Sequence, residues 1–64
     1  MDEILEVFKR QFNVLEQFLG ERTKRLYVGS MAKELGNGGI TQVAKITKLS
    51  KATITKGIKE LSDP

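Results

Sequence analysis

The sequence contains no cysteine, no histidine and no tryptophan, and it has a single proline. Without these residues there is no disulfide framework, no zinc finger of the usual kind, no thiol chemistry and no histidine to move protons near neutral pH. The lack of cysteine fits a reducing compartment. No apolar run approaches the roughly 20 residues that a membrane span requires, and the acidic start, Asp2-Glu3, has the wrong sign for a signal peptide. We therefore expect a cytoplasmic protein with no membrane association.

The chain is also short. Its 64 residues, 30% of them charged and 39% hydrophobic, suit one small soluble helical domain spanning residues 1–64. Such a domain buries only about 60% of the surface that its unfolded chain exposes. It has little room for a closed pocket and lacks the commonest catalytic side chains. We expect no enzymatic activity, no metal, no cofactor and no small-molecule ligand.

The net charge of +3 is unevenly distributed. Residues 1–20 carry four acids and two bases, whereas residues 21–64 carry four acids and nine bases. The segment 40–59 contains five lysines and no acid. Bases gathered in one region are typical of a protein that binds a polyanion. A solvated lysine surface that aids solubility gives the same pattern.

The first segment predicts a helix over 2–19, because its apolar residues recur at steps of three and four. These residues are Ile4, Leu5, Phe8, Phe12, Leu15, Phe18 and Leu19. The simplest interpretation is that this surface packs into the core. The alternative is a dimer or partner surface formed by Phe8, Phe12 and Phe18.

A second helix is predicted over 21–35, with a weaker apolar stripe that includes Leu26, Tyr27, Met31 and Leu35. Gly36 is expected to cap its C-terminus, and the run of glycines through residue 39 indicates a loop. This loop lacks the Gly-Lys-Ser/Thr of a P-loop and the preceding strand of a dinucleotide fingerprint. A phosphate cradle is therefore disfavoured.

The last third of the chain predicts two short helices. Thr41 is a good N-cap for a helix over 42–47, and Ser50 is a good N-cap for a helix over 51–61. Only Lys48 and Leu49 separate the first of these helices from the second cap, so the pair must cross steeply, as in a helix-turn-helix unit. We expect residues 61–64 to form a frayed tail.

Side chains of this segment separate into two surfaces. Val43, Thr47 and Leu49 are expected to face inward, together with the apolar row Ile54, Ile58 and Leu61. Gly57 lies beside that row and costs roughly 1 kcal/mol of helix propensity relative to alanine, so we expect a close helix contact there. The outer surface of the last helix is short, polar and cationic, which suits insertion into a major groove. It consists of Lys51, Ala52, Thr55, Lys56 and Lys59.

Residues 40–61 resemble the helix-turn-helix of many bacterial DNA-binding proteins, through the pattern V-A-x-x-T-x-L-S-x-x-T-I-x-x-G-I-x-E-L. The longer stretch 20–62 resembles the N-terminal region of ISAzo-type insertion-sequence transposases, which are DDE-class enzymes. The shared features are a Glu-Arg-x-x-Arg-Leu helix, a Leu-Gly-x-Gly-Gly-Ile loop and the helix-turn-helix. The sequence departs from this family in two ways. Lys48 stands at the turn position where glycine is usual, which implies strain on the order of 1 kcal/mol if the backbone there is left-handed. The second departure is the lack of a catalytic domain. The resemblance thus implies an excised domain or a remnant of a transposase.

The resemblance also implies a role for each residue at the DNA. Base-edge contacts are expected from Lys51, Ala52 and Lys56. Phosphate contacts are expected from Ser50, Thr53 and Thr55, and from the backbone N–H groups near Thr41 and Gln42. Sequence-independent attraction is expected from Lys45, Lys48 and Lys59. A second backbone-contacting patch is formed by Arg22, Lys24 and Arg25, unless these are simply solvated.

We therefore predict an all-α domain of four helices that binds double-stranded DNA through a helix-turn-helix and associates with the nucleoid. The expected target is the terminal inverted repeat of an insertion element. One alternative is a small free-standing transcriptional regulator, which would dimerise through helix 2–19. Another is a helical protein-interaction module with no nucleic-acid role. RNA binding is disfavoured because the sequence offers no aromatic platform for stacking bases.

Overall fold

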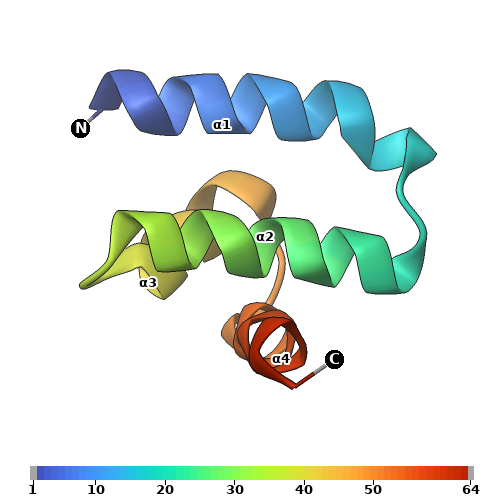
Figure 1. Cartoon of the computed structure of the whole chain (residues 1–64). Coiled ribbons are helices and arrows are strands. Elements are labelled where there is room, and N and C mark those ends of the chain that lie inside the picture. Colours follow the sequence, from blue (N-terminus) through green and yellow to red (C-terminus); the bar gives the residue numbers. More distant parts are fainter. Residues whose placement is uncertain (1, 64) are drawn as a thin grey trace.

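The computed structural model describes residues 2–63 and confirms the all-α class (Figure 1). The α-helices are α1 (Asp2–Leu15), α2 (Glu21–Leu35), α3 (Gly39–Thr47) and α4 (Lys51–Ser62), with a single 3₁₀ turn, η1 (Glu16–Phe18), after α1. Within these residues there is no strand. No helix in the described part of the chain is long and apolar enough to cross a membrane.

The first helix is shorter than predicted. Its α-helical part ends at Leu15 rather than at residue 19, and the last turn tightens into η1. The Leu19 N–H group donates a hydrogen bond to the Glu16 carbonyl oxygen, 3.2 Å away, and Leu19 itself is extended. A tightened last turn is a common way to satisfy the carbonyl groups at a helix end. The extended Leu19-Gly20 link then leads the chain into α2.

The predicted start of the third helix was wrong, because the glycine loop closes earlier than Thr41. Gly36 caps α2 as predicted, with φ near +74°, and its N–H group donates to the Ala32 and Lys33 carbonyl oxygens. Gly38 is the true N-cap of α3 and has φ near +78°, a left-handed conformation that glycine adopts without steric cost. The helix therefore begins at Gly39, three residues before the predicted start.

The turn between α3 and α4 follows the prediction closely. Lys48 is left-handed, with φ near +63°, and its N–H group donates to the Ala44 carbonyl oxygen. Ser50 is the N-cap of α4, because its Oγ accepts a hydrogen bond from the Thr53 N–H group at 3.1 Å. α4 continues to Ser62, so Leu61 and Ser62 are helical and do not belong to a frayed tail. Pro64 lies outside the described residues.

The second helix occupies the middle of the domain. α1 runs back along it in the opposite direction, while α4 is seen almost end-on on the other side of α2, so α2 and α4 cross steeply (Figure 1). Phe12 of α1 stacks on Tyr27 of α2 with ring centroids 6.4 Å apart. The core draws on every α-helix and consists of Phe12, Val28, Met31, Ala32, Val43 and Ile54.

Two glycines set the separation of α2 and α4. A Cβ atom added to Gly29 would lie 2.7 Å from the Gly57 carbonyl carbon, and one added to Gly57 would collide with the Arg25 carbonyl oxygen. Both glycines are buried. The expected close contact at Gly57 is thus confirmed, and it fixes α4 against the domain with its other side outward.

The apolar surface predicted for the first helix is buried only in part. Phe12 is 1% exposed and Phe8 packs against the core, but Phe18 is 75% exposed. Ile4 and Leu15 are also exposed, so their predicted place in the core was wrong. α1 contributes Phe8 and Phe12 to the core and leaves an apolar strip, which includes Ile4, Val7 and Val14, on the surface.

Candidate nucleic-acid interface

α4 presents one surface to the core and the other to solvent. Ile54 and Gly57 are buried and Ile58 is half-buried against the core, but Leu61, which was predicted for the same inward row, is 39% exposed. All of the residues predicted for the outer surface of this helix are exposed, namely Lys51, Ala52, Thr55, Lys56 and Lys59. Helical spacing of 100° per residue places Ala52 and Thr55 between Lys51 on one side and Lys56 on the other. Over the first two turns the outer surface is therefore a low strip bordered by lysines, and Lys59 lies on the same strip one turn further along.

Other predicted contact residues differ in accessibility. Thr41, Lys45, Lys48 and Ser50 are exposed, whereas Gln42 and Thr53 are half-buried. The side-chain oxygen of Gln42 is buried and accepts no hydrogen bond from the described residues. Its backbone N–H group donates to the Gly38 carbonyl oxygen at 3.0 Å. Gln42 consequently offers little to a phosphate, in contrast with the prediction.

Ser50 and Thr53 act first on each other. Besides the cap bond, the two hydroxyl oxygens lie 2.8 Å apart, within hydrogen-bonding distance. This pairing holds the first turn of α4 in shape. Each hydroxyl has one proton and two lone pairs. A hydroxyl that donated its proton to a phosphate could therefore take part in the cap only as an acceptor.

Lysines of the candidate interface lie in two different surroundings. Lys48 lines a groove between α1 and the turn, together with Lys9, Asn13 and Glu16. Lys56 and Lys59 line a shallow groove with Glu60 and Asp63 near the end of α4. The acid-free part of the surface is thus the start of α4, and Lys9 is a base near the turn that the sequence pattern did not single out.

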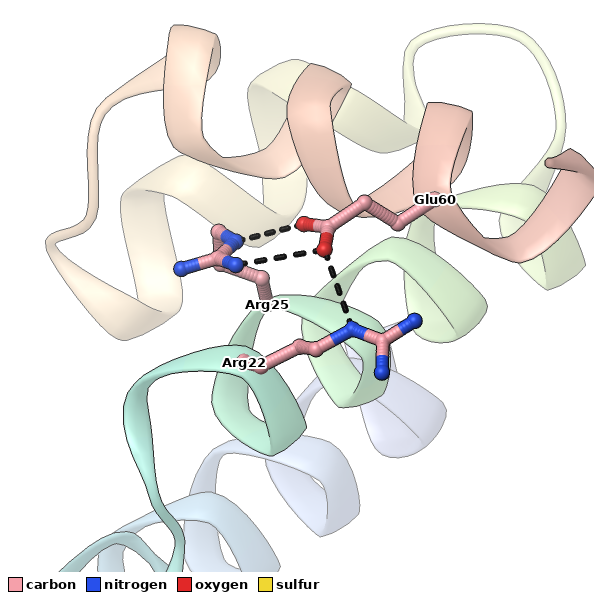
Figure 2. Close-up of polar contacts among 3 residues, drawn as sticks. All are labelled: Arg22, Arg25 and Glu60. Atoms are coloured by element: carbon pink, nitrogen blue, oxygen red, sulfur yellow. Dashed lines mark hydrogen bonds and ion pairs between the residues drawn. The ribbon is translucent and has the colours of Figure 1, made fainter. Parts of the chain in front are cut away.

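Each base of the second predicted patch forms an ion pair with an acidic side chain of the domain. These bases are Arg22, Lys24 and Arg25. Figure 2 shows Arg22 and Arg25 of α2 converging on the carboxylate of Glu60 in α4. Arg25 donates to both carboxylate oxygens, at 2.6 and 3.2 Å, and Arg22 Nε donates to one of them at 3.2 Å. Lys24 Nζ lies 3.8 Å from Glu16 Oε1. These bases therefore form contacts within the domain. Among the three, Arg22 is the one with a largely exposed side chain, at 61%.

This cluster shifts the pKa values of Glu60 and Arg25 in directions that favour their charged forms. The hydrogen bond from Arg25 holds the pKa of Glu60 below its ordinary value, and the weaker contribution of Arg22 acts in the same direction, against the partial desolvation of the carboxylate. The same Arg25–Glu60 hydrogen bond raises the pKa of Arg25. Glu60 therefore stays ionised and links α2 to α4 through a two-pronged, charge-assisted contact.

The described residues contain no cluster of three or more side chains that could hold a metal ion. Comparison with known proteins gives no independent indication, since no protein family, no curated protein and no solved structure matches the chain. The arrangement itself is a last helix, α4, that crosses α2 steeply and exposes a cationic surface on its other side. Such a surface can approach a polyanion without moving any core residue.

Proposed function

We propose that the chain binds duplex DNA by inserting the outer surface of α4 into the major groove. The observation that carries this proposal is the exposure of Lys51, Ala52, Thr55 and Lys56 along a helix whose opposite side is locked into the core. A major groove about 12 Å wide admits an α-helix. The small side chains allow close approach, and the lysines supply attraction to phosphates.

The turn geometry supports the same proposal. α3 and α4 are separated by Lys48, Leu49 and Ser50 alone, Lys48 is left-handed, and Leu49 packs against the core. This arrangement is compatible with a helix-turn-helix, in which the second helix enters the groove and the first crosses the backbone. In that docking, Lys45 and Lys48 lie toward the phosphates.

The sequence resemblance suggests a narrower role for the domain. As an N-terminal domain or remnant of an insertion-sequence transposase, it would hold the terminal inverted repeat of the element for a catalytic domain. It would then act on the nucleoid. A free-standing regulator is the alternative within DNA binding, and it differs by requiring a dimer on a two-half-site operator.

A charge-matched comparison tests the proposal. Lys51→Ala with Lys56→Ala should weaken binding to a duplex strongly while leaving helicity unchanged, because both lysines are exposed. The control is Lys33→Ala with Arg10→Ala, which removes the same charge from exposed positions of α2 and α1. Affinity should be measured by fluorescence anisotropy at several salt concentrations, where each lost phosphate contact lowers the slope of log K against log salt by about 0.9. Equal effects of the two double variants would refute the interface.

A second candidate function concerns α1. Ile4, Val7 and Val14 of α1 are exposed, and with Gln11 they recur at alternating steps of three and four; Phe18 in η1 extends the exposed apolar surface beyond the α-helix. That repeat is typical of a helix that pairs with another helix. Since Phe12 is buried, a dimer surface would consist of this strip and not of the three phenylalanines. Sedimentation equilibrium distinguishes the cases: a stable dimer that Val14→Glu dissociates favours a second copy of the chain, and a monomer at all concentrations opposes it.

A further inference from the structure

Two small side chains on the outer surface of α4 take no part in the core. Ala52 and Thr55 are exposed and contribute nothing to the core. The Thr55 hydroxyl forms no hydrogen bond with any described residue, in contrast with the hydroxyl groups of Ser50 and Thr53, which form the helix cap. Threonine is also a mediocre helix former, so helix propensity does not account for its presence in the middle of α4.

Their position between lysines is informative. Ala52 and Thr55 are one helical turn apart, so their side chains lie on one strip, with Lys51 and Lys56 at its borders. A lysine stem keeps its ammonium group several ångströms from the helix axis, where it can reach phosphates or guanine edges beside the strip. Beneath the first two turns, groups facing the strip meet a methyl group from Ala52, or a methyl or hydroxyl group from Thr55, while Lys59 follows one turn further along.

One feature of the major groove matches such a surface. Thymine is the base that projects a methyl group, at C5, into this groove, and alanine and threonine methyl groups recognise it by apolar contact. Small side chains also let the helix approach closely enough for that contact, which requires separations near 4 Å. Longer side chains at these two positions would hold the helix away.

We propose that Ala52 and Thr55 read thymine methyl groups, so that the preferred site of this domain contains thymines under the first two turns of α4. This inference rests on the proposed function and specifies its ligand: a duplex with thymine at defined steps, flanked by phosphates that the lysines contact. Ala52 and Thr55 are then the residues that determine specificity, while Lys51 and Lys56 supply most of the affinity.

The test begins with a duplex recovered from a random-sequence library by binding to the full chain. Each thymine of that duplex is replaced in turn by deoxyuridine, which lacks only the C5 methyl group and pairs normally. One or two replacements should weaken binding about fourfold each, as expected for loss of one buried methyl-sized group. The remaining replacements should have no effect.

Matched variants assign each contact to a residue. Thr55→Ser removes one methyl group and keeps the hydroxyl, whereas Thr55→Val keeps a methyl group in its place and removes the hydroxyl. Thr55→Ser should lose the discrimination between thymine and uracil at one position, and Thr55→Val should retain it. Ala52→Gly should lose discrimination at a neighbouring position, with circular dichroism confirming that the variant is still helical.

The possible failures are distinguishable. A duplex that binds tightly with no sensitivity to uracil at any position, or a library that yields no preferred sequence, would overturn the methyl readout while leaving DNA binding in place. Failure to bind any duplex at low salt would overturn the proposed function and this inference with it.

Discussion

Gly29 and Gly57 face each other at the point where α2 and α4 cross, with no side chain between the two backbones. A Cβ atom on either residue would penetrate main-chain atoms of the opposite helix and not a movable side chain. This crossing determines how far α4 stands from the domain. It therefore sets how much of the outer surface can project toward a ligand.

The crossing predicts a large effect of Gly57→Ala. The added methyl group would collide with the Arg25 carbonyl oxygen, and the two helices would have to separate. We expect a loss of about 3 kcal/mol or more, at the upper end of overpacking costs, which is a large part of the stability of so small a domain. Urea denaturation monitored by circular dichroism measures it. Gly20→Ala is the control, because a Cβ atom there meets nothing within 4 Å and the cost should not exceed about 1 kcal/mol.

Because Lys48 has a left-handed backbone, we expect its replacement by glycine to change stability and DNA affinity in opposite directions. Lys48→Gly should raise stability by about 0.5–1 kcal/mol, because glycine adopts a positive φ without the strain that lysine bears. The same variant should bind DNA more weakly if Lys48 contacts a phosphate. Lys45→Gly removes the same charge from within α3 and should cost about 1 kcal/mol instead. Thermal denaturation that ranks the two variants equally would contradict this account.

The cluster of Arg22, Arg25 and Glu60 predicts a pH-dependent contribution to stability. Because the pKa of Glu60 is lowered in the folded state, its ion pairs stabilise the protein fully above the unfolded carboxyl pKa, ordinarily near 4.5, and this contribution is lost as the pH falls through the folded value. Glu60→Gln should therefore be less stable than the parent protein near pH 7, and the difference should vanish in acid. Urea midpoints measured from pH 7 to pH 2 test this.

A suitable control for that series is Glu34→Gln. Glu34 is exposed and has no ion pair with the described residues, so its replacement should leave the midpoint almost unchanged at every pH. A constant difference between the parent protein and Glu60→Gln across the whole pH range would show that Glu60 acts through packing alone.

The N-cap of α4 gives a fourth prediction. Ser50→Ala should cost about 1 kcal/mol, because the Thr53 N–H group loses its acceptor. Ser50→Asp should retain the cap and the stability, while its negative charge should weaken binding to DNA. Ser30→Ala, at an exposed position within α2, should be neutral or slightly stabilising. Thermal melting together with duplex titration separates the capping role of Ser50 from any contact with phosphate.

Features that depend on a few neighbouring residues were predictable from the sequence. The cap at Gly36, the cap at Ser50 and the inward orientation of Val43 and Ile54 each follow from local hydrogen bonding or helical periodicity, and all are confirmed. The start of α3 was not predicted correctly. Thr41 is a good cap by type, but Gly38 adopts the left-handed conformation that closes the turn three residues earlier.

Features that depend on distant residues were harder to predict. Arg25 and Glu60 are 35 positions apart, so nothing in the local pattern of charges showed that the bases of α2 would be paired. The apolar residues of the first segment occupy more of the helix circumference than the core can cover. Periodicity alone therefore did not distinguish Phe12, which is buried, from Phe18, which is exposed. Val28, a fully buried residue, was missed although it precedes Met31 and Ala32 at helical spacing.

The steep crossing at Gly29 and Gly57 has a consequence for engineering. The residues that attach α4 to the rest of the domain lie away from its outer surface; they are Ile54, Gly57, Ile58 and Glu60. Substitutions at the solvent-facing positions 52, 55 and 59 therefore leave the scaffold intact. A library varied at those three positions, with proline left out, should yield folded proteins that each present a different surface from the same scaffold.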